Sequence, residues 1–416
     1  MAEDLSRDLR NGNDAFTSRM FSEIVKQKPQ QSVVLSAYSV LTPLAQLALA
    51  SEGESHDELL KAIGMPNDNV TKAVFSHAER SLKSVKGVEL KTASKIYIAP
   101  NYELNENFAT TTRDVFNSEV KNVDFTQAQK TASEINAWVE DQTNKKIKDL
   151  VNPDSLDGNT RAVLVNAIYF KGLWKSPFST YATYDQVFHI TKEKSATIPM
   201  MYQKSEFNYA ELPELNAKIL QMFYEGDEAS MILVLPNEID GITQLEEKLR
   251  DPSALNKAIS NMYSTEVEVT IPKFKIETTT DLKDVLSKMD VTKLFTPGQA
   301  RLTNLIKGEG DLVISEAIQK AFIEVNEEGA EAAAANEFIV VAESFVADAE
   351  PKIFFADRPF YFEIKLNTVT LFSAFLPVAT SLILDEPQAK FFVADRPFYF
   401  EIRTESTPIF SGVKFE

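Results

Sequence analysis

The chain has 416 residues, 44% of them apolar, a formal net charge of −18 and no cysteine. This length can bury a large core, and the missing cysteine excludes disulfides, thiol nucleophiles and thiolate metal sites. The acidic balance argues against a nucleic-acid partner, because phosphates bind to positive surfaces. The densest basic cluster is Lys145, Lys146 and Lys148, which we expect on a solvated helix face.

The first third of the sequence has the periodicity of amphipathic helices. Apolar residues recur at helical spacing over residues 16–25, and residues 41–50 form an apolar helix candidate. Residues 55–58, Ser-His-Asp-Glu, have the form of a capping box that leads into Leu59. The apolar residues of the segment 135–147 predict another long helix.

From about residue 162 the pattern changes to short apolar or β-branched runs, at residues 162–170, 231–235 and 267–271. Such runs are typical of strands in a buried sheet. No glycine- or serine-rich linker divides the chain, so one mixed α+β domain fits better than two. No run approaches the ~20 consecutive apolar residues of a membrane helix, so we expect no membrane partner.

Two features of the sequence bear on the cellular location. Residues 1–6 lack a basic start followed by an apolar run, so the sequence as given has no signal peptide. A mature secreted chain would look the same. Asn69-Val70-Thr71 is a glycosylation sequon that is usable only in a secreted protein. We expect an extracellular protein, with a cytoplasmic one as the alternative.

The C-terminal region contains an internal repeat. Residues 356–364, Ala-Asp-Arg-Pro-Phe-Tyr-Phe-Glu-Ile, recur without change as residues 394–402. Each copy is followed by a second strand-like segment, at residues 369–375 and 408–413. Alternate apolar positions predict one buried strand face in each copy. Two copies are too few for a solenoid, so the repeat is a local duplication.

The sequence contains no recognisable catalytic or metal-binding constellation. Its three histidines, His56, His77 and His189, are not at metal-ligand spacing. There is no Gly-x-Ser-x-Gly nucleophile elbow, and no pair among the 61 acids stands out. We therefore predict that the protein is not an enzyme and that it needs no metal or other cofactor.

An alanine-rich segment at residues 327–343 has conflicting local preferences. Its alanine run favours a helix or an alanine linker. Counted in twos from Ala330, however, all the acids lie on one face of an extended strand, and the other face is small or apolar apart from Asn336. The segment contains no Pro, Lys or Arg, so it could become a central strand of a sheet. A segment that must occupy two states can show such a conflict.

Several motifs, in the same order, resemble those of one family. Residues 325–335, Val-Asn-Glu-Glu-Gly-Ala-Glu-Ala-Ala-Ala-Ala, closely resemble the proximal hinge of inhibitory serpins. Residues 166–174, Asn-Ala-Ile-Tyr-Phe-Lys-Gly-Leu-Trp, are similar to the serpin strand that carries a sheet-opening Asn and Trp. Further matches lie at residues 33–36, 230–236, 271–276 and 357–362. The chain is thus identified as a member of the serpin family, most similar to the haemolymph antitrypsin-type serpins of moths.

The resemblance implies a serpin fold with three β-sheets, about nine helices and an exposed reactive-centre loop over about residues 327–350. The implied hinge residues are Glu327, Glu328, Gly329, Ala330, Ala332, Ala333, Ala334 and Ala335. The implied sheet-opening residues are Ser36, Ser39, Asn166, Trp174, Lys273 and Gln319. An ion pair between Lys273 and Glu327 is expected by family analogy. Ala37, Gln319 and Ala330 stand where many members have Pro, His and Thr.

The resemblance also implies the activity. A serpin presents its loop to a serine protease, forms an acyl-enzyme, and then inserts the cleaved loop into a sheet and distorts the enzyme. Family spacing places the scissile bond between Glu343 and Ser344, so the target should accept an acidic residue; cleavage after Phe338 or Phe345 is the alternative. We expect a monomer whose partner is a serine protease. A non-inhibitory carrier or storage serpin, or a protease substrate, is the alternative function.

The duplicated strands affect this prediction, because a serpin needs only one closing pair of strands after the loop. We expect residues 1–377 to form the serpin domain and residues 378–416 to form an appendage. Residues 408–413 look more like the usual serpin ending than residues 369–375 do. Docking of the second copy would, however, leave a very long loop from residue 327 to about 390, which favours a substrate over an inhibitor.

Overall fold

The computed structural model describes residues 2–28, 31–82, 85–308, 310–328, 350–367, 369–376, 398–403 and 408–414. The chain divides into two compact units, Met1–Ile383 and Leu384–Glu416. The nine α-helices in the described residues are α1 (Ala2–Gln27), α2 (Ala37–Ala50), α3 (Glu54–Ile63), α4 (Asp68–Leu82), α5 (Glu106–Phe116), α6 (Ala128–Gln142), α7 (Ile242–Leu249), α8 (Pro252–Ser260) and α9 (Leu282–Lys288).

The described strands form three sheets. Their bounds are β1 (Val33–Leu35), β2 (Val88–Ile98), β3 (Glu119–Asn122), β4 (Ala162–Gly172), β5 (Thr183–His189), β6 (Ser195–Leu212), β7 (Ala217–Phe223), β8 (Ala229–Pro236), β9 (Tyr263–Pro272), β10 (Phe274–Asp281), β11 (Glu316–Val325), β12 (Lys352–Phe355), β13 (Phe360–Leu366), β14 (Val369–Leu376), β15 (Phe398–Arg403) and β16 (Pro408–Lys414). The predicted α+β class is confirmed.

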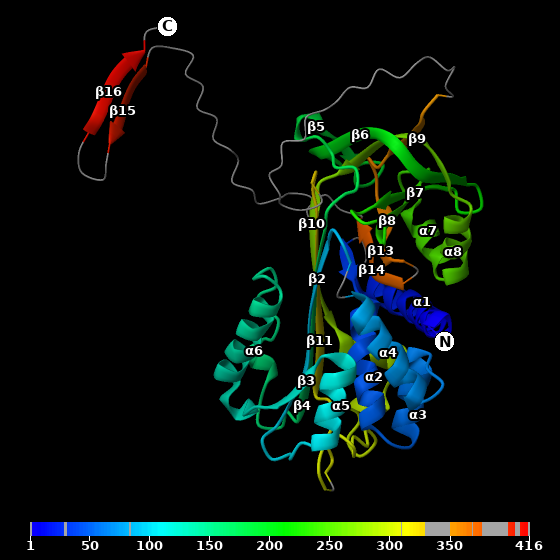
Figure 1. Cartoon of the computed structure of the whole chain (residues 1–416), viewed down its shortest axis with the longest axis vertical. Coiled ribbons are helices and arrows are strands. Elements are labelled where there is room, and N and C mark those ends of the chain that lie inside the picture. Colours follow the sequence, from blue (N-terminus) through cyan, green and yellow to red (C-terminus); the bar gives the residue numbers. More distant parts are fainter. Residues whose placement is uncertain are drawn as a thin grey trace. The chain divides into compact units, whose positions relative to one another are not determined.

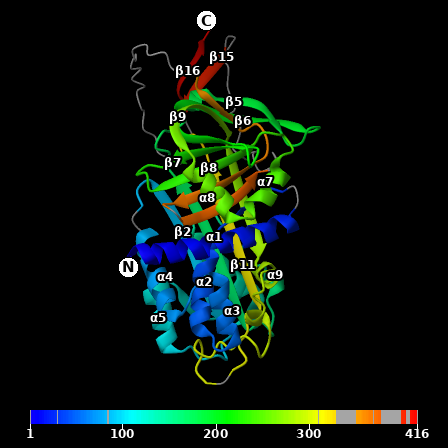
Figure 2. The ribbon, with the colours of Figure 1, turned by 90° about the vertical axis from the view of Figure 1, so that its right-hand side faces the viewer.

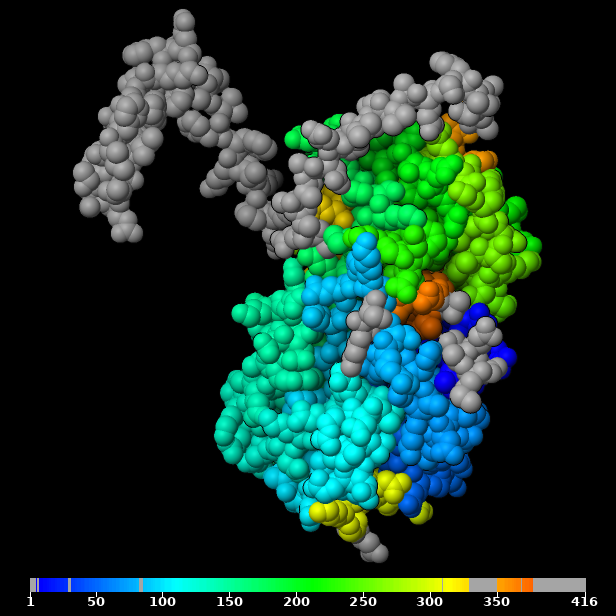
Figure 3. All heavy atoms as spheres, in the orientation of Figure 1, coloured from blue at the N-terminus to red at the C-terminus, as the bar shows by residue number. Residues whose placement is uncertain are grey.

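The five-stranded sheet has the order β10-β11-β4-β2-β3, with β11 and β4 parallel to each other at its centre. Figure 1 views this sheet nearly edge-on, with α6 on one side and α2, α4 and α5 on the other. The alternation of side chains along β4 explains both layers: Leu164 and Ile168 join the large core on the α2 side, whereas Val163 and Val165 join a smaller core under α6. In the space-filling view the atoms of α5 (cyan) and α6 (blue-green) lie at the surface of the molecule (Figure 3).

The helix α2 lies fully inside the molecule, with every residue from Ala37 to Ala50 buried. Ser36 caps it, because its side chain accepts a hydrogen bond from the backbone of Ser39. Figure 2 shows α1 lying across the molecule between α2–α5 and the second sheet.

The nine-stranded sheet follows the path β1-β14-β13-β8-β7-β6-β9-β12, and β5 also pairs with β6. The long strand β6 joins its two parts. Residues 195–201 of β6 pair with β5, residues 200–209 pair with β9, and residues 208–212 pair with β7. The first copy of the repeat lies in this sheet, because β13 pairs with β8 and β14, and β14 pairs with β1.

The second unit contains a hairpin with the same register as the first copy. In the first hairpin Ile364 pairs with Phe372, the register then shifts, and Lys365 pairs with Thr370. In the second hairpin Ile402 pairs with Phe410, followed by the same shift and a pair between Arg403 and Pro408. The repeated sequence therefore produces a repeated backbone.

Two local predictions were wrong. Ser55 does not cap a helix, since α3 begins at Glu54 with Gly53 as its N-cap residue, and Ser55 is buried. The lysine cluster 145–148 does not lie on a helix face, because α6 ends at Gln142. Lys145 has a positive φ of 60° in the turn that follows, a conformation that a helix does not use.

Candidate functional site

Four buried polar side chains connect the two central strands of the five-stranded sheet to the start of α2. We call Ser36, Ser39, Asn166 and Gln319 the closure cluster. Asn166 on β4 and Gln319 on β11 are opposite each other in the register. The Asn166 amide nitrogen donates to Ser39 O at 2.8 Å, and Ser39 Oγ donates to Asn166 Oδ1 at 2.7 Å.

Gln319 completes this network across the two strands. Its Nε2 lies 2.9 Å from Asn166 Oδ1, 2.9 Å from Ser39 Oγ and 2.8 Å from Ser36 O. All four side chains belong to buried residues. Hydrogen bonds in such a dry setting cost more to break than those in water, because the freed groups find no other partner. The cluster therefore adds to the backbone pairing of β4 and β11 in opposing their separation.

Trp174 lies just beyond β4, where β11 ends. Its indole Nε1 donates to Asn326 O at 3.0 Å, and its backbone nitrogen donates to Glu328 O at 3.2 Å. The indole stacks on Tyr224, with the ring centroids 4.5 Å apart and an interplanar angle of 11°. Trp174 thus holds the chain immediately after β11 against the end of β4.

Glu327 is fixed by three contacts at the same end of the sheet. Its carboxylate lies 3.3 Å from Lys273 Nζ and accepts a hydrogen bond of 2.9 Å from Thr183 Oγ1. Its carbonyl accepts from the backbone nitrogen of Phe178 at 2.8 Å. The ion pair expected between Lys273 and Glu327 is present. Both side chains are largely buried, so the ion pair and the two hydrogen bonds together fix the position of Glu327.

The strand directions determine what a returning segment could pair with. A segment that turns back after β11 runs antiparallel to β11, and therefore also antiparallel to β4, which is parallel to β11. Both neighbours would then offer antiparallel ladders to one inserted strand. Gly329, Ala330, Ala332–Ala335 and the predicted scissile pair Glu343–Ser344 lie outside the described residues.

Sequence reasoning missed the contacts of Thr183, Phe178 and Tyr224. Each of these residues reaches the site only through the tertiary structure, and its neighbours in the sequence form no motif that would indicate the contact.

The sequon residue Asn69 is exposed in the first turn of α4, while Thr71 is buried. Within the described residues no cluster of His, Asp or Glu could hold a metal ion, and no helix of that part has the length and apolar character needed to cross a bilayer.

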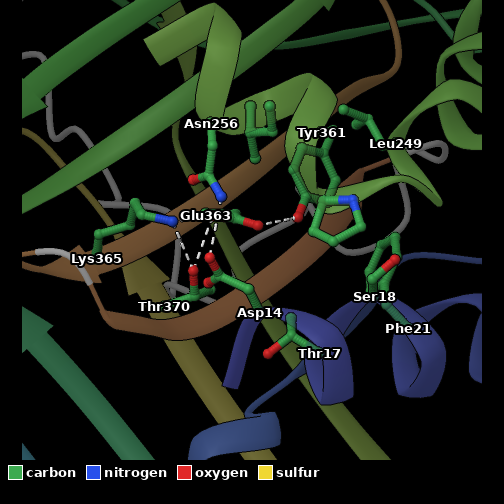
Figure 4. A pocket seen from close by; sticks show the side chains of 12 residues that line it. Asp14, Thr17, Ser18, Phe21, Leu249, Asn256, Tyr361, Glu363, Lys365 and Thr370 are labelled. Atoms are coloured by element: carbon green, nitrogen blue, oxygen red, sulfur yellow. Dashed lines mark hydrogen bonds and ion pairs between the residues drawn. The ribbon is translucent and has the colours of Figure 1, made fainter. Parts of the chain in front are cut away.

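The first hairpin is fixed by a second buried polar network (Figure 4). Glu363 accepts hydrogen bonds from Tyr361 at 2.6 Å, from Lys365 at 3.0 Å and from Thr370 at 3.0 Å. The side chains of Glu363 and Lys365 are each 8% exposed, and burial raises the pKa of the nearby Asp14 carboxyl. A buried ion pair is favourable only when the other donors and acceptors of the two side chains are hydrogen-bonded. The place of this hairpin in the sheet, between β8 and β1, which we call the slot, therefore discriminates among the side chains that can fill it.

Comparison with known proteins identifies the family to which the chain belongs. A family model described as "Serpin (serine protease inhibitor)" matches residues 11–377, and the chain belongs to the serpin family. This description, which names inhibitors, fits the prediction that the chain is not an enzyme.

Two curated relatives and one solved structure are especially similar. The chain is 60% identical to Alaserpin of Manduca sexta, over 89% of this chain and 94% of the relative. It is 55% identical to Antitrypsin of Bombyx mori over the same shares of the two chains. The crystal structure of Serpin48 from the insect Tenebrio molitor matches with a TM-score of 0.81 at 34% identity, over 89% of this chain and 98% of that one.

Proposed function

We propose that this protein inhibits serine proteases by inserting its cleaved loop as a new strand between β11 and β4. One observation carries the proposal: the loop begins at the end of β11, beside the parallel neighbour β4, so a strand inserted between them would replace their one parallel pairing with two antiparallel ones. Cleavage would free residues 329–343 to turn back along β11. In that cleavage the serine of the protease would attack the carbonyl of Glu343 and the amine of Ser344 would leave, so the protease would stay bound to Glu343 as an acyl-enzyme while the loop inserts and carries it to the far end of the sheet.

The driving force would come from completing the sheet. An inserted strand of about a dozen residues gains ladder hydrogen bonds worth on the order of 1 kcal/mol each, in addition to apolar burial. The alternating pattern of residues 330–343 keeps acids off one face, which suits a strand that lies over a core. Glu343–Ser344 is the proposed scissile bond, and the target is then a protease that accepts an acidic residue.

The partner and location follow from the same proposal. The protein would act outside cells as a monomer, as expected of an inhibitor that resembles haemolymph serpins. The alternative, a non-inhibitory serpin cleaved as a substrate, is favoured by the duplicated hairpin, because docking of the second copy would lengthen the loop.

A panel of serine proteases that includes acid-specific enzymes tests this function. We expect a protease that cleaves after glutamate to form a complex that survives boiling in detergent, with cleavage mapped by mass spectrometry to Glu343–Ser344. The chain already cleaved in its loop is the control and should form no complex. Cleavage of the intact chain by the whole panel without any stable complex would favour the substrate alternative.

We further propose that residues 1–377 form the functional domain and that the first hairpin is the one that closes the core. In the slot, Thr370 bonds to Glu363 and Lys365, Phe375 packs on Phe21 with ring centroids 4.8 Å apart, and Leu376 is fully buried. By register, the second hairpin would place Pro408, Val413 and Lys414 at these three positions. It would lose the hydroxyl, leave a void and bury a charge.

Truncation and substitution test the choice of hairpin. A chain that ends at Pro377 should keep its melting temperature within about 2 °C, whereas Leu376→Lys in the full chain should lower the free energy of unfolding by about 3 kcal/mol or more. Both are measured by thermal and urea unfolding. Collapse of the truncated chain together with tolerance of Leu376→Lys would show that the second hairpin fills the slot.

A further inference from the structure

The most exposed large apolar side chains of the described residues all lie on one group of neighbouring elements. They are Tyr181 in the turn before β5, Tyr184 and Val187 on β5, Tyr202 on β6, Tyr263 on β9 and Ile353 on β12. The strands β5, β6, β9 and β12 are successive neighbours in the nine-stranded sheet, and the first three lie together in Figure 1. An exposed apolar patch on a monomer usually marks a binding surface.

The strand register places part of this group on one face of the sheet. Tyr202 is opposite Thr270 of β9, and Thr270 is opposite Phe355 of β12, so these three side chains share one face of the sheet. Tyr184 is opposite Met200, two positions from Tyr202, which makes Tyr184 and Tyr202 diagonal neighbours. Ile353, two positions before Phe355, lies on this face as well. We call Tyr184, Tyr202, Ile353 and Phe355 the aromatic stripe.

Charged residues beside the stripe on the same face are mostly acidic, with Lys204 among Glu206, Glu266 and Glu268. Lys204 lies opposite Glu268 on the same face, and its Nζ is 3.0 Å from a carboxylate oxygen of Glu266. The stripe itself carries no charge, and Tyr184 and Ile353 are 62% and 57% exposed. An apolar centre with a polar rim is the composition of a protein–protein interface, and tyrosines are frequent among the residues that dominate binding energy.

The position of the stripe indicates its occupant. Thr183, next to Tyr184, donates a hydrogen bond to Glu327 at the start of the loop. Strand β12, which carries Ile353, begins at Lys352, nine residues after Glu343. Nine residues span at most roughly 30 Å, and a protease of about 250 residues has a radius of gyration of roughly 18 Å. A protease bound at the scissile bond is therefore held within reach of the stripe.

We propose that the aromatic stripe is a docking surface for the target protease, which it contacts through an apolar patch outside the active-site cleft. This proposal rests on the proposed function. The contact forms before cleavage. It therefore raises the rate at which the complex forms and helps to determine which protease is bound, and it leaves the later insertion step unchanged.

Rate measurements test the docking surface. The protease of the panel that reacts fastest with the wild-type chain is combined with the double variant Tyr184→Thr/Tyr202→Thr, in which threonine retains strand propensity. We expect the second-order rate constant to fall roughly tenfold or more, with unchanged stoichiometry and melting temperature. Tyr263→Thr is the matched control: it is 52% exposed on β9, seven residues or roughly 23 Å from Thr270, and should leave the rate constant within about twofold.

A binding measurement separates this proposal from the proposed function. Catalytically inactive forms of the same proteases, with the active-site serine replaced by alanine, are titrated with the wild-type chain and the double variant. Weaker binding of the double variant supports the docking surface even when no active protease forms a stable complex. Equal complex-forming rates and equal affinities for both chains would overturn the docking surface and leave the inhibitory function intact.

Discussion

Replacing Ala332 with arginine should convert the protein from an inhibitor into a substrate. Positions 330, 332 and 334 form the small face of the alternating segment, and an inserted strand places this face over the core. A guanidinium there would have to leave water without a partner, at a cost of several kcal/mol. Insertion would stall, and the acyl-enzyme would hydrolyse before the protease is displaced. We expect the yield of stable complex to fall at least tenfold.

The control for this experiment is Ala333→Arg. Residue 333 belongs to the opposite face, which carries Glu331 and Glu337, so the arginine can remain in water. This variant should form complexes with nearly wild-type yield, measured by densitometry at equal molar ratios of the two proteins. If both variants inhibit normally, the segment does not insert as a strand. If both fail, the alternation of faces is not what governs insertion.

Asn166→Ala should give the second large effect, on the stability of the closed sheet. The substitution removes an acceptor for Ser39 and Gln319 and the donor to Ser39 O, so several buried groups lose partners at once. We expect the free energy of unfolding in urea to fall by about 2–3 kcal/mol. Because the same bonds resist separation of β4 and β11, the variant should also insert its cleaved loop faster, which the rate of complex formation after acylation would reveal.

Ser94→Ala is the matched control for the closure cluster. Ser94 on β2 is opposite Asn166 in the register, and its hydroxyl is buried with no hydrogen-bond partner among the described residues. Its removal should change the free energy of unfolding by less than about 0.5 kcal/mol. Equal losses for the two variants would mean that Asn166 contributes only its volume and that the hydrogen bonds do not hold the strands together.

Much of the fold could be predicted from the sequence where one pattern dominates. The run at residues 162–170, apolar apart from Asn166, became the central strand β4, and the repeat became two hairpins of equal register. The capping box at Ser55 failed because Gly53 can begin the helix two residues earlier, with a positive φ of 62°. Local capping signals compete in this way, and only the tertiary position of the helix decides between them.

The candidate site was predictable only in part. Asn166, Gln319 and Ser39 were expected to act together on grounds of family resemblance, since they are 127 to 280 residues apart and share no local pattern. The contact between Thr183 and Glu327 was missed, because a hydroxyl in an edge strand carries no signal of its partner. The aromatic stripe was also missed, since Tyr184 and Tyr202 lie on different strands, and a tyrosine in a strand looks the same in sequence whether its face is buried or exposed.

The chemical make-up of the closure cluster has a consequence for the pH response of the protein. Two hydroxyls and two carboxamides make up the cluster, and none of these groups gains or loses a proton near neutral pH. A histidine at position 319, as in many serpins, would titrate between about pH 5 and 8 and would couple opening of the sheet to acidity. With Gln319 in its place, separation of β4 and β11 involves no protonation step within the cluster, so any pH dependence of this separation must come from groups outside it, such as Glu316 on β11, whose carboxyl pKa is raised by burial.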